Sequence, residues 1–557
     1  MTRTTSISTH EVTNQSPPFR DVNLFTSDKA QLEAVEREGG KAGTKALTAF
    51  GAKTGSADAC ERGRLANEFP PRLKSFDEKG NRIDRVEFHP AYHECMAISM
   101  AEGLHCATNE HLLQGGKPKP GANVIRAAGS FMAVQMEPGH CCPVTMTNAS
   151  VAALVTEPDL AGAWLPKILV RAYDSSFQPA AGKRAVTIGM GMTEKQGGTD
   201  VRANTTRAEP VSEHGSGAHR ITGHKWFLSA PMCDAFLILA QAPKGLSCFL
   251  LPRFLPDGGL NAMRIQRLKD KLGNRANASC EVEFEGALAW RVGEEGRGVA
   301  TIIEMVTLTR LDCAVSSAAM MRFGLANAIH HCKHRQVFGR KLAEQPMMAS
   351  VLADLALESE AATALAFRLA RTFDHPGDPR EASWQRVMTP IIKYWVCKST
   401  PGFSYEAMEC LGGNGYVEDG TAARIYREAP VNAIWEGSGN VMGLDVLRVL
   451  MKEPDAAELV IEGLGQDVAG NKRLSAYLAG VREILHRPRE LEANMRVFVE
   501  GLALATAGAL LNAHAPHAVS DAFIASRLEG PFRRTYGAGL TRADTAGIID
   551  RAAPVGL

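Results

Sequence analysis

Apolar positions change their spacing along the chain, and the change predicts where helices give way to strands. Residues 88–170 contain long Ala-, Leu- and Met-rich stretches with few internal breakers, which predicts helices, one of them around residues 93–103. Short apolar runs at residues 236–240, 248–251 and 280–284 are separated by Gly, Pro and Asn, a pattern typical of strands. A helix-rich part therefore precedes a strand-rich part.

Helical character returns after Gly298 and continues to about Leu450. Breaks at residues 338–339, 375–377 and 411–415 divide this stretch, so we expect four long helices there. The remaining residues again carry a helical pattern. The prediction is a mainly α protein with one β domain and an extra helical domain at the C-terminal side.

Four parts follow from these changes of pattern. We expect a helical N-terminal domain with an extended N-terminus over residues 1–183, and a middle β domain, predicted to be a barrel, over residues 184–290. A four-helix-bundle domain over residues 291–450 and a C-terminal helical domain over residues 451–557 complete the prediction. A length of 557 residues agrees with three or four domains of roughly 150 residues each.

Composition narrows the classes of protein. A formal net charge of +1 with 22% charged residues shows no global basic excess, so a polyanion partner would have to use a local patch. The polar first ten residues do not resemble a signal peptide, and we expect no membrane span. Twelve scattered cysteines without a regular framework favour reduced thiols and a cytoplasmic location.

One group of potential metal ligands occurs, at His330, His331, Cys332 and His334. Neighbours at these spacings spread around a helix and do not converge on one point. We therefore expect no structural metal.

The loop at residues 191–200 lies between two apolar segments and contains several glycine and hydroxyl-bearing residues that could bind a ligand. Gly197 and Gly198 can adopt backbone angles that are closed to other residues and let a ligand approach the main chain. Thr193 and Thr199 offer hydroxyl groups to ring carbonyls or phosphates. Taken alone, the loop fits either a cofactor cradle or an ordinary glycine-rich turn before a strand.

Two further motifs favour binding of a diphosphate. Gly412 and Gly413 free backbone N–H groups beside a helix end, as in an anion nest, although a simple helix C-cap has the same composition. Arg335 has a planar, positively charged guanidinium that can donate hydrogen bonds to a phosphate, and Phe338 can pack against a ring. Taken alone, Arg335 fits equally well as a solvated residue that ends a helix.

The order of domains and these motifs together resemble the acyl-CoA dehydrogenase family. The loop at residues 191–200 fits the first signature of that family, and a second signature is complete at Glu409, residues 412–416, Asp419, Arg424 and Glu428. Arg335 and Phe338 lie in a segment similar to the one that reaches across a subunit interface to the flavin pyrophosphate. The resemblance implies FAD shared between neighbouring subunits, and hence an oligomer.

The resemblance also implies a catalytic base. Residues 434–440 are similar to the family segment whose glutamate removes the α-proton of an acyl thioester, which makes Glu436 the candidate. A positioned carboxylate of this kind contributes roughly 10² to 10⁴ in rate when partial burial raises its pKa. Some relatives instead place the base before an arginine early in the bundle, but here Thr309 precedes Arg310, so that option is closed.

Carried over residue by residue, the family pattern predicts a set of cofactor contacts. The set comprises Met192, Thr193, Gly198, Thr199, Trp226, Phe227, Leu228, Ser229, Arg335, Phe338, Gly412, Gly413, Trp435, Gly437, Ser438 and Asn440. Trp226 is expected against the isoalloxazine ring. Family members usually carry a threonine where this chain has Leu228, which removes a hydroxyl from the reacting edge unless Ser229 takes its place.

Several short sequence segments are more similar to one branch of the family, the AidB-type flavoproteins of the bacterial adaptive response to DNA alkylation. The closer match lies in residues 65–67, 88–90, 142–147, 190–200, 268–284 and 431–440. The resemblance implies an FAD-containing homotetramer that binds double-stranded DNA without strong sequence preference through its added C-terminal domain.

The residues of that C-terminal domain give mixed support for DNA binding. From Met451 onward there are twelve Lys or Arg against thirteen Asp or Glu, so binding would require clustering of the cations. The candidates for a shared face are Lys472, Arg473, Arg482, Arg487, Arg489 and Arg496. A solvated helix face is the alternative interpretation of the same residues.

Three hypotheses follow. The first is an AidB-like FAD protein of the alkylation response with weak acyl-CoA dehydrogenase activity and non-specific DNA binding. The second is a metabolic dehydrogenase acting on a short or branched acyl-CoA, in which the C-terminal domain serves only assembly. The third is a flavin-bearing DNA shield without turnover.

Overall fold

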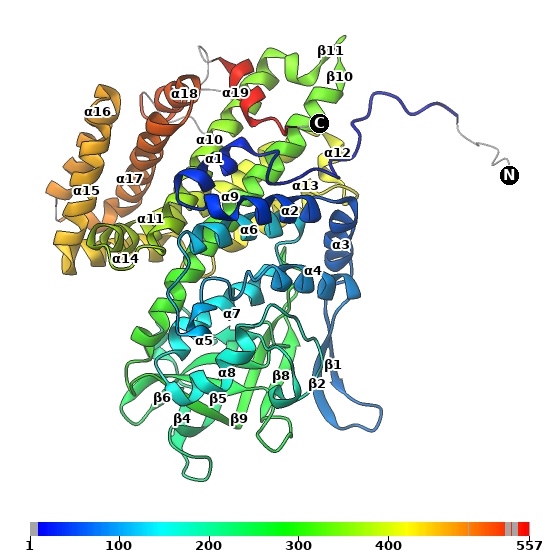
Figure 1. Cartoon of the computed structure of the whole chain (residues 1–557), viewed down its shortest axis with the longest axis vertical. Coiled ribbons are helices and arrows are strands. Elements are labelled where there is room, and N and C mark those ends of the chain that lie inside the picture. Colours follow the sequence, from blue (N-terminus) through cyan, green and yellow to red (C-terminus); the bar gives the residue numbers. More distant parts are fainter. Residues whose placement is uncertain (1–8, 488, 530–535, 537–543, 556–557) are drawn as a thin grey trace.

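The computed structural model describes residues 9–487, 489–529, 536 and 544–555. A β-rich domain lies at one end of the elongated molecule, and long helices extend from it to the other end (Figure 1). This architecture confirms the predicted fold class, a mainly α protein with one β domain. The Ser/Thr-rich start, residues 1–8, is outside the described residues.

The N-terminal part consists of eight helices and one hairpin within the described residues. The helices are α1 (Lys29–Arg37), α2 (Thr44–Thr54), α3 (Ala57–Glu68), α4 (Pro90–Ala101), α5 (His111–Gln114), α6 (Ala122–Met136), α7 (Cys141–Leu154) and α8 (Pro158–Ile168). Strands β1 (Arg72–Phe76) and β2 (Arg82–Glu87) form an antiparallel hairpin that the sequence analysis did not predict. Side chains of β1 alternate between exposed and half-buried, and a turn that contains Gly80 (φ 83°) joins the two strands.

The middle domain is a seven-stranded sheet that folds back on itself. Its strands are β3 (Ile188–Gly191), β4 (Arg207–Pro210), β5 (Ala218–Ser229), β6 (Ala235–Ala242), β7 (Gly245–Pro252), β8 (Met263–Leu268) and β9 (Ser279–Val292). The order is β3-β5-β4-β6-β7-β9-β8, and additional pairings join β3 to β6 and β5 to β9. Strands β6, β7 and β9 contain the three apolar runs from which strands were predicted.

The bundle contains three long helices and the shorter α14, so the stretch after the break at residues 411–415 is not the single long helix that the pattern predicted. The four helices are α9 (Gly298–His334), α10 (Pro346–Thr372), α11 (Pro379–Glu409) and α14 (Gly439–Lys452). The connections contain β10 (Gln336–Val337), β11 (Arg340–Lys341), α12 (Gly413–Tyr416) and α13 (Ala422–Glu428). Helix α11 begins where Asp378 caps the N–H of Arg380 and Pro379 occupies the first turn.

The C-terminal helices pack beside the bundle and share its apolar core (Figure 1). They are α15 (Pro454–Val468), α16 (Lys472–Arg482), α17 (Leu491–His514), α18 (His517–Arg527) and α19 (Thr545–Ala552). A second apolar cluster fills the β domain and includes residues of α7 and α8. The strand-rich middle therefore has its own core, which meets the helical core along α7 and α9.

Helix α17 departs from the expectation that no segment approaches a membrane span. Among the described residues it alone is long and apolar enough to cross a membrane by length and composition. However, 67% of its apolar window is buried inside the protein, against α10, α11, α14, α16 and α18. Packing in the core accounts for most of this apolar surface.

Candidate functional site

The pairing of β3 with β5 brings together two segments that were predicted to hold the cofactor ring. Met190 pairs with Ser229 and Gly191 with Leu228, and the backbone N–H of Trp226 donates to the carbonyl of Thr193 at 2.8 Å. Thr193 of the loop and Trp226 are thus neighbours, although they are 33 residues apart in sequence.

A buried ion pair fixes this arrangement. The ammonium of Lys225 lies 2.7 Å from a carboxylate oxygen of Glu194 and also donates to the carbonyl of Leu239 at 2.7 Å. Burial alone would raise the pKa of Glu194, but Lys225 and donors from Thr205 and Thr206 outweigh it and lower the pKa to about 2. Both side chains are fully buried, so the pair acts as an internal anchor for the loop.

Beside these strands lies a cavity of about 60 Å³ between the β domain, α7 and α9. Met190 and Ser229 line it from the strand pair, and Trp435 and Glu436 line it from the turn before α14. The remaining lining residues are Pro138, Cys141, Cys142, Thr145, Met146, Thr309, Asp312, Cys313, Ser316, Glu428 and Asn432. The predicted base and the predicted ring-binding strands therefore meet at one cavity, which we call the reaction cavity.

The backbone at Glu436 is strained. Its φ is 58°, in the left-handed region that non-glycine residues rarely adopt, and the following Gly437 has a φ of 107°. Lys393 donates to the carbonyls of Trp435 at 2.9 Å and Gly437 at 2.5 Å. Arg310 donates to the carbonyl of Glu436 at 3.1 Å, so cations hold three successive carbonyls of the turn.

These cations also act on the ionisation of Glu436. Burial raises the pKa of the Glu436 carboxyl, while a hydrogen bond from Thr309 and the charges of Arg310 and Lys393 oppose that rise. Arg310 is itself oriented by Asp445, whose carboxylate accepts at 2.6 Å. The balance favours a carboxyl group that exchanges a proton more readily near neutral pH than an exposed glutamate does.

A second carboxyl group lines the same cavity. Glu428 is buried and accepts from both the backbone N–H and the side-chain amide of Asn274. Burial raises its pKa to about 7, although the bonds from Asn274 and the charge of Lys271 lower it. The sequence signature included Glu428, but no spacing in the sequence singled out Asn274 or Lys393 as supports.

Several predicted ring contacts lie near the cavity without lining it. One face of the Trp226 ring carries the ammonium of Lys269, 3.3 Å from the ring centroid. Phe227 is partly exposed, whereas Leu228 is fully buried in the β-domain core against Gly191. Ser229 lines the cavity and Leu228 does not, so the hydroxyl group on this strand comes from position 229. Met192, Gly198 and Thr199 lie in the adjoining loop, and Ser438 and Asn440 lie at the start of α14.

The predicted diphosphate residues do not belong to this cavity. Arg335 follows Thr309 by 26 residues along α9, roughly 39 Å at 1.5 Å per residue. Phe338 is 95% exposed, and a side chain at Gly412 or Gly413 would meet nothing within 4 Å. The guanidinium of Arg335 donates to the carbonyl of Asn14 at 2.6 Å and has no carboxylate partner in the described part of the chain.

The six predicted DNA-binding residues divide into two groups. Arg473 pairs with Asp521 and Glu529, both at 2.5 Å, and Arg482 donates to the carbonyl of Ile461 at 2.8 Å. The others have no carboxylate within ion-pair distance among the described residues and are exposed; they are Lys472, Arg487, Arg489 and Arg496. No metal-binding group of three or more His, Cys, Asp or Glu occurs within the described ranges.

Comparison with solved structures defines the class of protein. The apo form of Bd2924 superposes with a TM-score of 0.82 at 28% identity, covering 90% of this chain and 99% of that one. ACDH-11 of Caenorhabditis elegans in complex with C11-CoA also gives 0.82, at 26% identity over 98% of this chain and 93% of that one. The fold is that of the acyl-CoA dehydrogenases.

Sequence comparison narrows the class to a family. Family models match residues 14–175 (adaptive response protein AidB, N-terminal domain), 189–287 (acyl-CoA dehydrogenase, middle domain) and 296–451 (acyl-CoA dehydrogenase, C-terminal domain). AidB of Escherichia coli (strain K12) is 47% identical over 483 residues, covering 86% of this chain and 88% of that protein. The chain belongs to the AidB-type acyl-CoA dehydrogenases, a family whose members are FAD flavoproteins.

The residues of the site fit that cofactor. An indole face at Trp226, hydroxyl groups at Thr193 and Ser229 and a carboxylate at Glu436 occupy adjoining positions, a donor set suited to a flat, polar-edged ring. The guanidinium of Arg335, which has no carboxylate partner among the described residues, and the open backbone at Gly412 and Gly413 suit a diphosphate.

Proposed function

We propose that this protein is an FAD-dependent oxidoreductase that removes the α-proton of an acyl thioester with Glu436 and that also binds double-stranded DNA in a response to alkylation. The observation that carries the enzymatic part is the meeting of Glu436 and the β3–β5 strand pair at one cavity. FAD bound beside that strand pair supplies the acceptor for the hydride of the β-carbon.

The chain itself supplies the proton chemistry. The carboxylate of Glu436 accepts the α-proton, and the buried surroundings that raise its pKa stabilise the protonated form that results. Lys393 and Arg310 keep the turn in its left-handed conformation, which holds the carboxyl group toward the cavity throughout. Thr145, Met146, Cys313 and Ser316 line the remaining walls and limit the access of water.

An oligomer is part of the proposal. Thr309, which lines the reaction cavity, and Arg335 are roughly 39 Å apart along α9, so the two parts of the predicted FAD site are widely separated within one chain. Arg335, Phe338, Gly412 and Gly413 would therefore hold the diphosphate of an FAD whose ring lies in a neighbouring subunit. This supports an oligomer; the resemblance implies a homotetramer, and sedimentation of the FAD-loaded protein measures its mass.

Substitution at Glu436 tests the enzymatic part. Glu436→Gln removes the base with little change of volume, so anaerobic flavin reduction by isovaleryl-CoA should slow by roughly 10² to 10⁴ while FAD content stays unchanged. Glu304→Gln, an exposed carboxylate on α9, is the matched control and should behave like the parent. Reduction of the flavin at the parent rate by Glu436→Gln would refute the assignment.

The alkylation-response part rests on the name of the N-terminal family model, adaptive response protein AidB. It also rests on the four exposed cations of the C-terminal helices that lack carboxylate partners, Lys472, Arg487, Arg489 and Arg496. Contacts from such residues to phosphates would give affinity that falls steeply with salt and depends weakly on sequence.

A charge-matched pair of variants tests DNA binding. Replacing Lys472, Arg487, Arg489 and Arg496 with alanine should weaken binding to a 30-base-pair duplex and reduce the slope of log affinity against log salt by about 0.9 per lost phosphate contact. The control replaces four exposed lysines elsewhere, Lys45, Lys53, Lys74 and Lys79, with alanine. Equal loss in both variants would leave only an effect of total charge and would refute the assignment of these four residues to the binding site.

The two experiments together separate the three hypotheses. A metabolic dehydrogenase should reduce its flavin rapidly and show no salt-sensitive DNA binding. A flavin-bearing shield should bind DNA and show no flavin reduction that depends on Glu436.

A further inference from the structure

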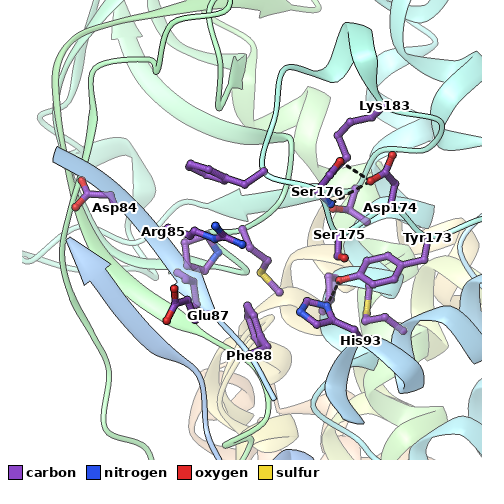
Figure 2. A pocket seen from close by; sticks show the side chains of 17 residues that line it. Asp84, Arg85, Glu87, Phe88, His93, Tyr173, Asp174, Ser175, Ser176 and Lys183 are labelled. Atoms are coloured by element: carbon purple, nitrogen blue, oxygen red, sulfur yellow. Dashed lines mark hydrogen bonds between the residues drawn. The ribbon is translucent and has the colours of Figure 1, made fainter. Parts of the chain in front are cut away.

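A second and larger cavity, of about 320 Å³, lies on the other side of the first turn of α7. It shares no lining residue with the reaction cavity, although Pro143 follows Cys142 and Met232 lies three residues from Ser229. The β1–β2 hairpin, α4 and the segment 173–187 enclose it (Figure 2). Its volume lies in the range that small-molecule pockets occupy in proteins.

Aromatic and other apolar side chains form much of its wall. Phe88 stacks on Tyr92 with ring centroids 4.2 Å apart and meets the edge of His93 at 5.7 Å. Phe177 and Tyr173 lie on the segment opposite the hairpin. Met96, Met232, Pro143, Pro231 and Val86 complete the apolar surface. Such a wall suits a flat ring, because aromatic rings pack face to edge or offset against one another.

His93, which lines the cavity, has a ring nitrogen without a hydrogen-bond partner among the described residues. The Nδ1 atom of His93 lies 2.8 Å from the hydroxyl of Tyr173, and no described residue bonds to Nε2 (Figure 2). Burial and the nearby charge of Arg85 lower the pKa of His93, so its ring is neutral at pH 7. A neutral imidazole offers one further polar contact to a ligand.

The charges around the cavity are unevenly compensated. Asp84 is paired with Arg82 at 2.9 Å and Lys183 with Asp234 at 2.8 Å, while Asp174 accepts from Ser176 and from the backbone of Arg184. Arg85 has no carboxylate partner among the described residues, and its guanidinium lies 5.9 Å from the Phe177 ring. In Figure 2, Asp84 and Glu87 lie at the edge of the group, away from its middle.

A second guanidinium strengthens the positive potential behind Phe177. Arg253 is buried, lies 5.7 Å from the same ring and bonds only to backbone carbonyls, those of Ile83, Asp84 and Met263. Burial lowers the pKa of Arg253 to about 10, and the nearby charge of Asp84 partly opposes that shift. Two cations thus flank the Phe177 ring at one wall, and the carboxylates that line the cavity are Asp84, Glu87 and Asp174.

We propose that this cavity binds a small planar aromatic molecule that carries an anionic group, with the ring held among Phe88, Tyr173 and Phe177 and the anion facing Arg85. Both aromatic carboxylates and purine nucleotides share this chemistry. The site is separate from the reaction cavity and does not depend on the function proposed for Glu436.

Calorimetric titration of the FAD-loaded protein with two probes tests the proposal. The probes are 2-naphthoate and adenosine 5′-monophosphate, and neutral 2-naphthylmethanol serves as the uncharged comparison. Arg85→Gln should weaken binding of an anionic probe at least tenfold and leave the neutral probe unchanged, whereas Phe177→Ala should weaken all probes that bind. Lys79→Gln, which removes one exposed charge from the turn of the same hairpin, should leave every affinity unchanged.

Each outcome of the titration either supports or overturns the proposed binding site. Arg85-dependent binding of either anionic probe supports the site, and the tighter of the two identifies the carboxylate or the nucleotide as its ligand class. Absence of binding of both probes at millimolar concentration, or equal effects of Arg85→Gln and Lys79→Gln, overturns it. Loss of binding in Glu436→Gln would also overturn it, because the probe would then occupy the reaction cavity.

Discussion

Lys225 and Glu194 meet inside the β domain at 2.7 Å, and each is the immediate sequence neighbour of a predicted cofactor contact. Glu194 follows Thr193 and Lys225 precedes Trp226, and the backbones of those two contacts are hydrogen-bonded to each other. The ion pair therefore couples the position of the glycine-rich loop to that of the aromatic strand. Its burial makes the coupling stiff, since either charge left alone would be costly.

Breaking this pair should destabilise the fold and loosen the cofactor. Lys225→Met leaves Glu194 buried without its counter-ion, which costs about 3–5 kcal/mol of unfolding free energy in comparable pairs. Urea unfolding measures the loss, and release of FAD on dilution should quicken in parallel. Lys195→Met, next to Glu194 but exposed, is the control. A Lys225→Met protein as stable as this control would contradict the role assigned to the pair.

Lys393 should set the protonation of Glu436 as well as its position. Lys393→Met removes a positive charge that lowers the pKa of Glu436, so the pKa of the base in the pH profile of flavin reduction should move to higher pH. Two carbonyls also lose their donor, which should reduce the rate at every pH. Lys398→Met, exposed on the same helix, should shift neither quantity. If the pH profile of flavin reduction is the same in Lys393→Met as in the parent, Lys393 does not set the pKa of Glu436.

Glu428 should make stability depend on pH in the acidic range. Its folded pKa of about 7 lies above the unfolded value near 4.5, so its contribution is greatest below about pH 4.5 and is lost as the pH rises toward 7. The loss is on the order of 3 kcal/mol. Glu428→Gln cannot ionise, so its unfolding free energy should decline less over that interval.

Urea unfolding of the parent and Glu428→Gln at several pH values between 4.5 and 7 provides the measurement. Glu418→Gln, an exposed carboxylate in the preceding segment, serves as the control. Parallel curves for the parent and Glu428→Gln would mean that Glu428 keeps an ordinary pKa in the folded protein.

Ser229 and Leu228 should respond differently to substitution. Leu228 packs in the β-domain core, so Leu228→Thr buries a hydroxyl there and should cost about 1–3 kcal/mol of stability without increasing flavin reduction. Ser229 lines the reaction cavity, so Ser229→Ala should alter the flavin absorption spectrum with little loss of stability. Faster flavin reduction by Leu228→Thr would show that position 228, and not 229, faces the cofactor.

How far the sequence could predict the site depended on the kind of signal each residue carried. Strands β6, β7 and β9 were indicated by apolar runs, whereas Glu436 and Trp226 were indicated by local motifs that resemble those of a known family. Lys393 and Arg310 lie in no such motif. A lysine or arginine on a helix shows the same sequence pattern whether its side chain points into the protein or into solvent. Their role follows only from tertiary contacts with the carbonyls of residues 435–437.

The same limit applies to the C-terminal cations and to the hairpin. A count of charges could not distinguish Arg473, which forms ion pairs with Asp521 and Glu529, from the exposed Lys472 beside it. The β1–β2 hairpin was overlooked because its strands are short and largely exposed, which leaves few apolar positions to count. Its importance comes from the second cavity, which it helps to enclose.

The segment at residues 14–17 has consequences for the timing of folding on the ribosome. Asn14, Gln15, Ser16 and Pro17 bond to partners at residues 330–336 and at Asn414, more than 300 positions later in the chain. At 5–20 residues per second, these partners are synthesised roughly 15–60 s or more after the segment itself. Residues 14–17 can therefore make these contacts only after the chain has been synthesised beyond residue 330, later than contacts among the N-terminal helices can form.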